Sequence, residues 1–116
     1  MNSIQLTGRL VRDPEMRSVS EDTKVCTIRL AVDGMGRGGR DETGYVNVVS
    51  FGKSAQAAAN TLSKGWLVAV NGRLQHETWE AQDGSKREGY SVVGHVEFLA
   101  RPRNDVPASE DAAKAA

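Results

Sequence analysis

The strongest constraint on the fold is the alternation of apolar and polar residues along five short segments. In the clearest of them, Cys26, Ile28, Leu30 and Val32 occupy every second position. A period of two is typical of β-strands with one buried face, because successive side chains point to opposite sides of a sheet. The predicted strands span residues 4–10, 24–32, 45–53, 66–74 and 90–99. The side chains expected to face the core are Ile4, Leu6, Leu10, Cys26, Ile28, Leu30, Val32, Val46, Val48, Val68, Val70, Leu74, Tyr90, Val92, Val96 and Phe98.

One short helix is predicted between the third and fourth strands. Ser54 is the expected N-cap, and Gly65 is expected to take the left-handed conformation that follows a helix. The apolar stripe of this helix consists of Ala55, Ala58, Ala59 and Leu62. Small residues on the stripe allow close approach, so we expect the helix to cover one end of a barrel.

This order of elements predicts an all-β fold with one short helix. Three strands, a helix and two further strands match the five-stranded Greek-key barrel called the OB-fold. Residues 1–102 are therefore expected to form this barrel. Residues 103–116 show no periodicity and are expected to form a short disordered tail, acidic and rich in alanine.

The third predicted strand carries two aromatic rings on one face. Tyr45, Asn47, Val49 and Phe51 alternate with the small apolar side chains of the opposite face. At ~3.3 Å per residue, the two rings lie roughly 20 Å apart. The rings either form an exposed surface on which unpaired bases stack, or they fill a second core. The segment by itself leaves both interpretations open.

The formal net charge of zero conceals an uneven distribution along the chain. Residues 1–103 carry 14 Lys and Arg against 12 Asp and Glu, whereas residues 104–116 carry one Lys against three acidic residues. The body of the protein is therefore mildly basic, which is a weak electrostatic signature for nucleic acid. The sequence contains no apolar run long enough to span a membrane and begins without a signal-peptide pattern, so we expect a cytoplasmic protein.

Few residues carry the chemistry of a catalytic or metal site. Cys26, the single cysteine, is in phase with core positions, which predicts a packed thiol and no internal disulfide. His76 and His95 have no second ligand at a recognisable spacing. No motif joins them to an acid or a nucleophile. We therefore expect no metal, no cofactor and no enzymatic activity.

Several short motifs follow one another at regular intervals. They are Leu6-Thr7-Gly8-Arg9-Leu10, Asp13-Pro14-Glu15-Met16-Arg17, Arg29-Leu30-Ala31-Val32, Val48-Val49-Ser50-Phe51-Gly52-Lys53, Lys64-Gly65, Gly72-Arg73-Leu74 and Trp79 ahead of Asp83-Gly84. In this order the motifs, over about residues 1–100, resemble the bacterial and phage single-stranded DNA-binding proteins. The resemblance implies an OB-fold, usually assembled as a homotetramer, with single-stranded DNA wrapped over the strand faces.

The resemblance also implies which residues contact DNA. Base stacking is expected on Tyr45, Phe51 and Trp79, the last of which precedes a predicted polar loop at residues 80–88. A hairpin tryptophan that packs on its own loop is the alternative for Trp79. Trp66 and Tyr90 are expected to be structural. Candidate contacts to phosphate are Arg9, Arg12, Arg17, Arg29, Arg37, Arg40, Lys53, Arg73, Lys86 and Arg87.

These features predict a non-catalytic protein that coats single-stranded DNA without regard to sequence. The role that the resemblance implies is the protection of unwound DNA in the nucleoid during replication, recombination and repair. In the family, an acidic C-terminal peptide recruits replication and repair proteins, and residues 103–116 carry a faint version of it. The alternative function is an OB-fold adaptor that binds mainly proteins, as a primosome component does. Salt-sensitive binding of single strands distinguishes the two.

Overall fold

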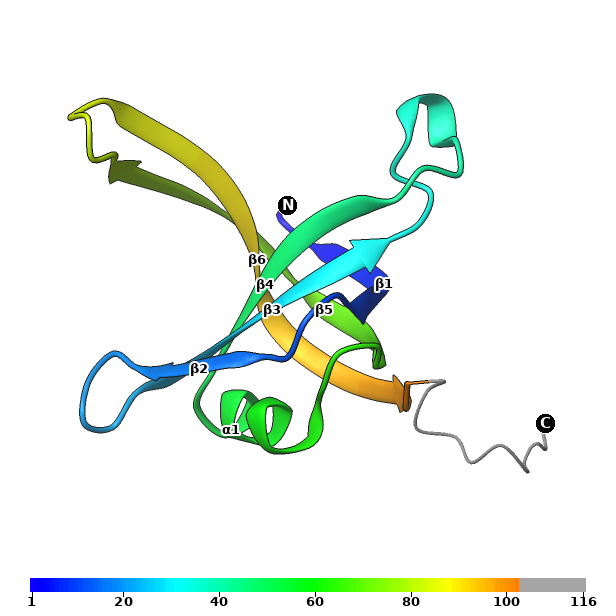
Figure 1. Ribbon diagram of the computed structural model, residues 1–116, viewed down its shortest axis with the longest axis horizontal. Coiled ribbons are helices and arrows are strands. Elements are labelled where there is room, and N and C mark those ends of the chain that lie inside the picture. Colours follow the sequence, from blue (N-terminus) through cyan, green and yellow to red (C-terminus); the bar gives the residue numbers. More distant parts are fainter. Residues whose placement is uncertain (103–116) are drawn as a thin grey trace.

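The computed structural model describes residues 1–102, so the tail predicted for residues 103–116 lies outside the described residues. The strands are β1 (Ile4–Leu10), β2 (Glu15–Ser18), β3 (Lys24–Val32), β4 (Gly44–Phe51), β5 (Leu67–Glu80) and β6 (Lys86–Ala100). One α-helix, α1 (Gly52–Thr61), follows β4, and a short 3₁₀ helix, η1 (Arg37–Gly39), lies in the glycine-rich loop before it. Figure 1 shows the strands wrapping around a common axis.

The strands close into a barrel through two pairings between segments distant in sequence. The sheet order is β1-β5-β6-β4-β3-β2, and β1 also pairs with β3 through Leu10 opposite Leu30. β4 and β6 run parallel, with Val48 opposite Val92. All other pairings are antiparallel. The result is the predicted five-stranded OB-fold barrel.

The structure adds a sixth strand and lengthens two others. β2 pairs along the outer edge of β3 and has only four residues, too few for a clear alternation. β5 and β6 run for 14 and 15 residues, well beyond the predicted ends of the fourth and fifth strands. Their outer parts form a hairpin arm that projects from the barrel (Figure 1). The turn at the tip spans only residues 81–85, not the polar loop predicted for residues 80–88.

The core is close to the one that the alternation predicts. Side chains from the barrel strands and α1 meet inside it, and the buried hydrophobic residues are Leu10, Val25, Cys26, Ile28, Leu30, Val32, Val48, Ala55, Ala58, Leu62, Val68, Val70, Val92 and Val96. Ile4, Leu6, Val46 and Trp66 are partly buried and pack against this cluster. Removal of this apolar surface from water is the main force that holds the strands together.

Three residues predicted for the core are exposed, and the prediction was wrong for each. Tyr90 is 60% exposed, Leu74 41% and Phe98 37%. Leu74 and Tyr90 do lie in phase with core side chains, but on the part of β5 and β6 that extends past the barrel, where no other strand among residues 1–102 covers them. Phe98 lies near the other end of β6, edge-on to the Trp66 ring at a centroid distance of 6.1 Å.

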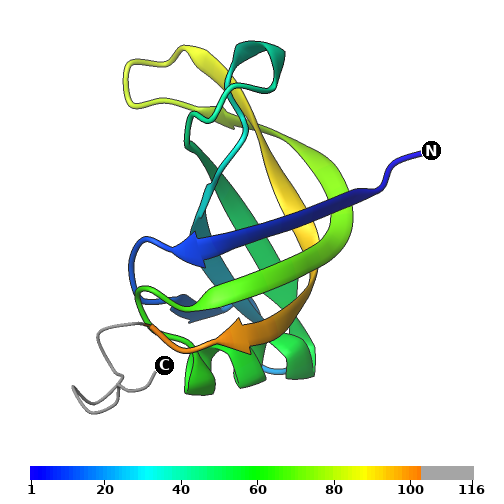
Figure 2. The ribbon, with the colours of Figure 1, turned by 90° about the vertical axis from the view of Figure 1, so that its right-hand side faces the viewer.

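The helix covers one end of the barrel, as predicted, although its ends differ in detail. Figure 2 shows α1 beneath the strands, opposite the hairpin tip and the glycine-rich loop. The helix begins at Gly52, so Ser54 lies inside its first turn and is not the N-cap. Gly65 has the expected positive φ of 94°, but in a turn beyond Leu62, where the helix ends. Among residues 1–102, no helix has the length and apolar character to cross a membrane.

Candidate nucleic-acid interface

Strand β4 presents its two aromatic rings to solvent. Tyr45 is 57% exposed and Phe51 47%, whereas Val48, on the opposite face, is fully buried. This difference follows from the alternation of side chains along the strand, which turns the valine into the barrel and the rings away from it. Within residues 1–102 the rings therefore do not fill a second core. Both rings are exposed enough to contact a flat ligand such as a nucleobase.

An arginine on the neighbouring strand is held beside Tyr45. Arg29 pairs with Asn47 across β3 and β4, and its Nη1 donates a hydrogen bond of 2.9 Å to Asn47 Oδ1. The guanidinium carbon lies 5.5 Å from the centroid of the Tyr45 ring, within the range of a cation–π interaction. A guanidinium has five N–H donors, so most remain free for a phosphate. The sequence indicated Arg29 as a phosphate contact, whereas its hydrogen bond to Asn47 depends on the pairing of β3 and β4.

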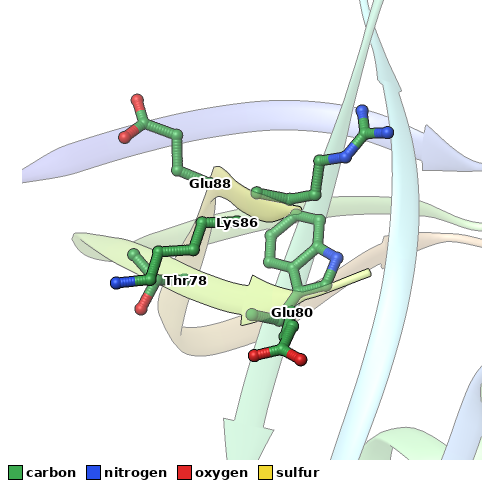
Figure 3. Close-up of a pocket in the computed structure, with 6 residues that line it drawn as sticks. Thr78, Glu80, Lys86 and Glu88 are labelled. Carbon is green, nitrogen blue, oxygen red and sulfur yellow. The ribbon is translucent and has the colours of Figure 1, made fainter. Parts of the chain in front are cut away.

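Trp79 lies on the hairpin arm, in β5 itself. Its indole is 52% exposed and pairs across the strands with Arg87. A Cβ placed on Gly89 would lie 3.2 and 3.3 Å from two ring carbons, so the ring rests on the backbone of this glycine. A hollow of about 390 Å³ opens around the pair and is lined by Thr78, Trp79, Glu80, Lys86, Arg87 and Glu88. Figure 3 shows the side chains that line this hollow, with Thr78, Glu80, Lys86 and Glu88 labelled.

The tip of the arm holds Arg87 in a network of hydrogen bonds. Asp83 Oδ1 accepts bonds from the Ser85 hydroxyl at 2.6 Å and from the Ser85 backbone N–H at 2.9 Å. The Ser85 hydroxyl in turn accepts a bond of 3.2 Å from Arg87 Nε. Arg87 Nη2 also lies 3.9 Å from Asp83 Oδ2. The hydroxyl bond, followed by the backbone bond, lowers the pKa of Asp83 below its ordinary value, because both bonds favour the ionised carboxylate.

The strand register places these residues on one surface. Arg73 lies opposite Val93, Val93 opposite Val49, and Val49 opposite Thr27, so one face runs across β5, β6, β4 and β3. Directly opposed residues share a face, as does every second residue along a strand. We call this surface the aromatic face. It contains Arg17, Arg29, Tyr45, Phe51, Arg73, Trp79 and Arg87.

The other predicted phosphate contacts have different positions. Lys86 points to the opposite face of the arm, although it lines the same hollow as Trp79. Lys53 is exposed in the first turn of α1, two residues after Phe51. Arg9 donates a hydrogen bond of 2.9 Å to the Gly65 carbonyl, so it fastens β1 to the turn before β5. Arg12, Arg37 and Arg40 are also exposed and lie in neither a strand nor α1.

The residues with the greatest chemical reactivity do not form a separate site. Cys26 is fully buried in the core, as predicted, and burial raises the pKa of its thiol. His76 lies 3.5 Å from a Glu88 carboxylate oxygen, with its ring centroid 5.1 Å from that of Tyr90. Within residues 1–102, no three His, Cys, Asp or Glu side chains are grouped to hold a metal ion.

A closed five-stranded barrel with exposed rings and arginines on one face defines the class of OB-fold oligonucleotide-binding domains. Comparison with known proteins narrows this class. The sequence model of the single-strand binding protein family matches residues 1–99, and the chain belongs to this family.

Named relatives agree with this assignment. A single-stranded DNA-binding protein of Clostridium tetani is 41% identical over 102 residues, which cover 85% of this chain and 70% of the relative. One of Thermotoga maritima is 39% identical over 116 residues, which cover 95% of this chain and 82% of the relative. Single-stranded DNA-binding protein 2 of Staphylococcus aureus is 41% identical over 107 residues, with 90% and 75% covered.

Proposed function

We propose that this protein binds single-stranded DNA with little sequence preference and coats it during replication, recombination and repair. The observation that carries the proposal is the aromatic face, on which Tyr45, Phe51 and Trp79 are each about half exposed. Every nucleobase has a π-face, so stacking on such rings does not depend on base identity. The curated relatives are named for single-stranded DNA binding, which favours this function over a protein-binding adaptor.

Stacking and charge have separate tasks in the proposed mechanism. Each ring stacks one base, a contact of ~1–3 kcal/mol. Arginines on the same face contact the backbone phosphates that lie between the stacked bases, and each neutralised phosphate releases bound counterions. Because the chain carries no net charge, stacking must supply a large share of the affinity. No step in this mechanism breaks or forms a covalent bond, so the protein acts as a binding protein and not as an enzyme.

We further propose that the chain acts as a homo-oligomer, most simply a tetramer, in the cytoplasm with nucleoid DNA. The apolar side chains of Leu74 and Tyr90, exposed on the opposite face of the hairpin arm, support self-association, because a second copy would cover them. Light scattering after size exclusion tests this: four copies of the 12.5 kDa chain are expected, and a single-chain mass contradicts it. Recruitment of replication and repair proteins is proposed for residues 103–116.

The test of DNA binding uses the intrinsic fluorescence of Trp79. The Trp66→Phe variant removes the second tryptophan and keeps an aromatic ring against Phe98, so that emission reports on the aromatic face alone. The variant is titrated with oligo(dT) at two salt concentrations. We expect saturable quenching, because a stacked base contacts the indole, and weaker binding at the higher salt.

Two outcomes would contradict the proposal. A folded protein that shows no quenching and does not raise the anisotropy of labelled oligo(dT) does not bind single strands. Binding that is equally tight to duplex DNA of the same length would show that the rings do not discriminate, since bases inside a duplex cannot stack on them.

A further inference from the structure

The Arg87 side chain is restrained before any ligand arrives. Its Nε donates to the Ser85 hydroxyl at 3.2 Å, and its Nη2 lies 3.9 Å from Asp83 Oδ2. The Ser85 hydroxyl is itself held by the 2.6 Å bond that it donates to Asp83. These contacts use one edge of the guanidinium. The two N–H donors of Nη1 remain available on the other edge.

Trp79 is restrained by the same hairpin. Its ring rests on Gly89, where an added Cβ would make tight contacts of 3.2 and 3.3 Å with it, and Arg87 is its direct cross-strand partner. The outer end of the indole is therefore next to backbone, while about half of the residue stays exposed. A single base can stack on the exposed part of the ring, with its phosphate close to the arginine.

From this arrangement we infer that Asp83 and Ser85 are positioning residues, which hold Arg87 beside Trp79 so that the pair binds one nucleotide as a unit. This inference rests on the proposed function and refines it. A long side chain that must be immobilised on binding costs affinity, and an arginine already fixed in place avoids most of that cost. The lowered pKa of Asp83 has the same origin, because the hydrogen bonds from Ser85 stabilise its ionised carboxylate.

Because Asp83 is negatively charged, a variant that removes the charge distinguishes a positioning role from simple repulsion between the carboxylate and DNA phosphates. DNA phosphates repel a carboxylate, so the removal of an acidic residue near them should tighten binding. If Asp83 positions Arg87, Asp83→Asn should weaken binding instead. Glu80 provides a control carboxylate on the same arm, because it lines the hollow and, among the described residues, its side chain makes no hydrogen bond or ion pair. Glu80→Gln is expected to tighten binding slightly.

The central experiment leaves the charge unchanged. Ser85→Ala removes the hydroxyl that links Arg87 to Asp83, and Ser85→Thr retains it. Affinity for labelled oligo(dT) is measured by anisotropy in each variant. We expect Ser85→Ala to weaken binding about 2- to 10-fold, the range that corresponds to the ordering of one long side chain, and Ser85→Thr to restore it. The effect should vanish in the Arg87→Gln background, where no guanidinium is left to position.

Three results would overturn the inference. They are wild-type affinity in Ser85→Ala, an undiminished effect of Ser85→Ala in the Arg87→Gln background, and tighter binding by Asp83→Asn matching that of Glu80→Gln. If Ser85→Ala fails to fold, as seen by circular dichroism, the Asp83 and Glu80 variants still decide the question. The unmodified protein is the reference: if it does not bind oligo(dT), the proposed function fails, whereas normal wild-type binding with unaffected variants refutes only the positioning role.

Discussion

Replacement of Trp79 by alanine gives the most direct test of how the aromatic face binds. The outer end of the indole rests on Gly89, and the residue is 52% exposed, so we expect it to stack one base. The expected loss is therefore the stacking energy of one base, ~1–3 kcal/mol, which weakens binding about 5- to 140-fold. Because the indole carries no charge, the dependence of the affinity on salt should keep its slope.

The assay measures the dissociation constant for labelled oligo(dT) by anisotropy at several salt concentrations, together with the free energy of unfolding in urea. Trp79→Ala should change the stability by less than about 1 kcal/mol, because the ring lies on the arm outside the core. Trp66→Ala is the matched control. That ring is partly buried against the core, so its loss should cost about 2 kcal/mol, roughly half the value for a fully buried tryptophan.

Two results would refute this interpretation of Trp79. Unchanged affinity in the folded Trp79→Ala protein would show that no base stacks on the indole. A large loss of stability, similar to that of Trp66→Ala, would show that Trp79 is a structural residue of the hairpin, the alternative that the sequence left open.

Further predictions concern charge, packing and titration. Lys53→Gln and Arg73→Gln should each lower the magnitude of the salt slope by about 0.7, the value for one phosphate contact on a single strand, as measured in the same anisotropy titrations. Gly72→Ala should destabilise the fold by at least about 1–3 kcal/mol in urea unfolding, because the added Cβ would overlap the Val93 carbonyl. The Cys26 thiol should react with a thiol reagent only as the protein unfolds. Because burial raises the pKa of this thiol, its contribution to the free energy of unfolding is full below the pKa of the unfolded thiol and decreases as pH rises above that value. The Asp83 carboxyl should titrate in carbon NMR with a pKa below that of free aspartate. Its contribution to the free energy of unfolding is present above the ordinary pKa and is lost as pH falls through the lowered pKa.

Local patterns in the sequence account for most of the fold. The alternation of Ile28 and Leu30 with polar neighbours identified β3, because a strand with one buried face must repeat every two residues. The stripe of alanines at helical spacing predicted α1, because residues three and four apart share one face of a helix. β2 was missed because its four residues form an edge strand whose pairing depends on β3 and not on a pattern of its own.

The aromatic residues show where local pattern stops. The alternation of residues predicted that Tyr45 and Phe51 share one face of a strand, but it contains no information on whether that face is covered. In the structure both rings are exposed. For Tyr90 the phase was right and the inference of burial was wrong, because β5 and β6 extend past the barrel. Burial depends on what lies opposite a side chain, and a period of two contains no information about that.

The sequence by itself determined the class of fold, the order of the five barrel strands and the helix, most of the core, and the residue types able to stack and to neutralise phosphate. Only the tertiary structure decided that Arg73 and Trp79 on β5, Tyr45 on β4 and Arg29 on β3 share one surface, and that Ser85 is bonded to an arginine beside the indole. The physical reason is that periodicity is a property of neighbours along the chain. A binding surface is made by strand register and barrel closure, which join residues that are distant in sequence.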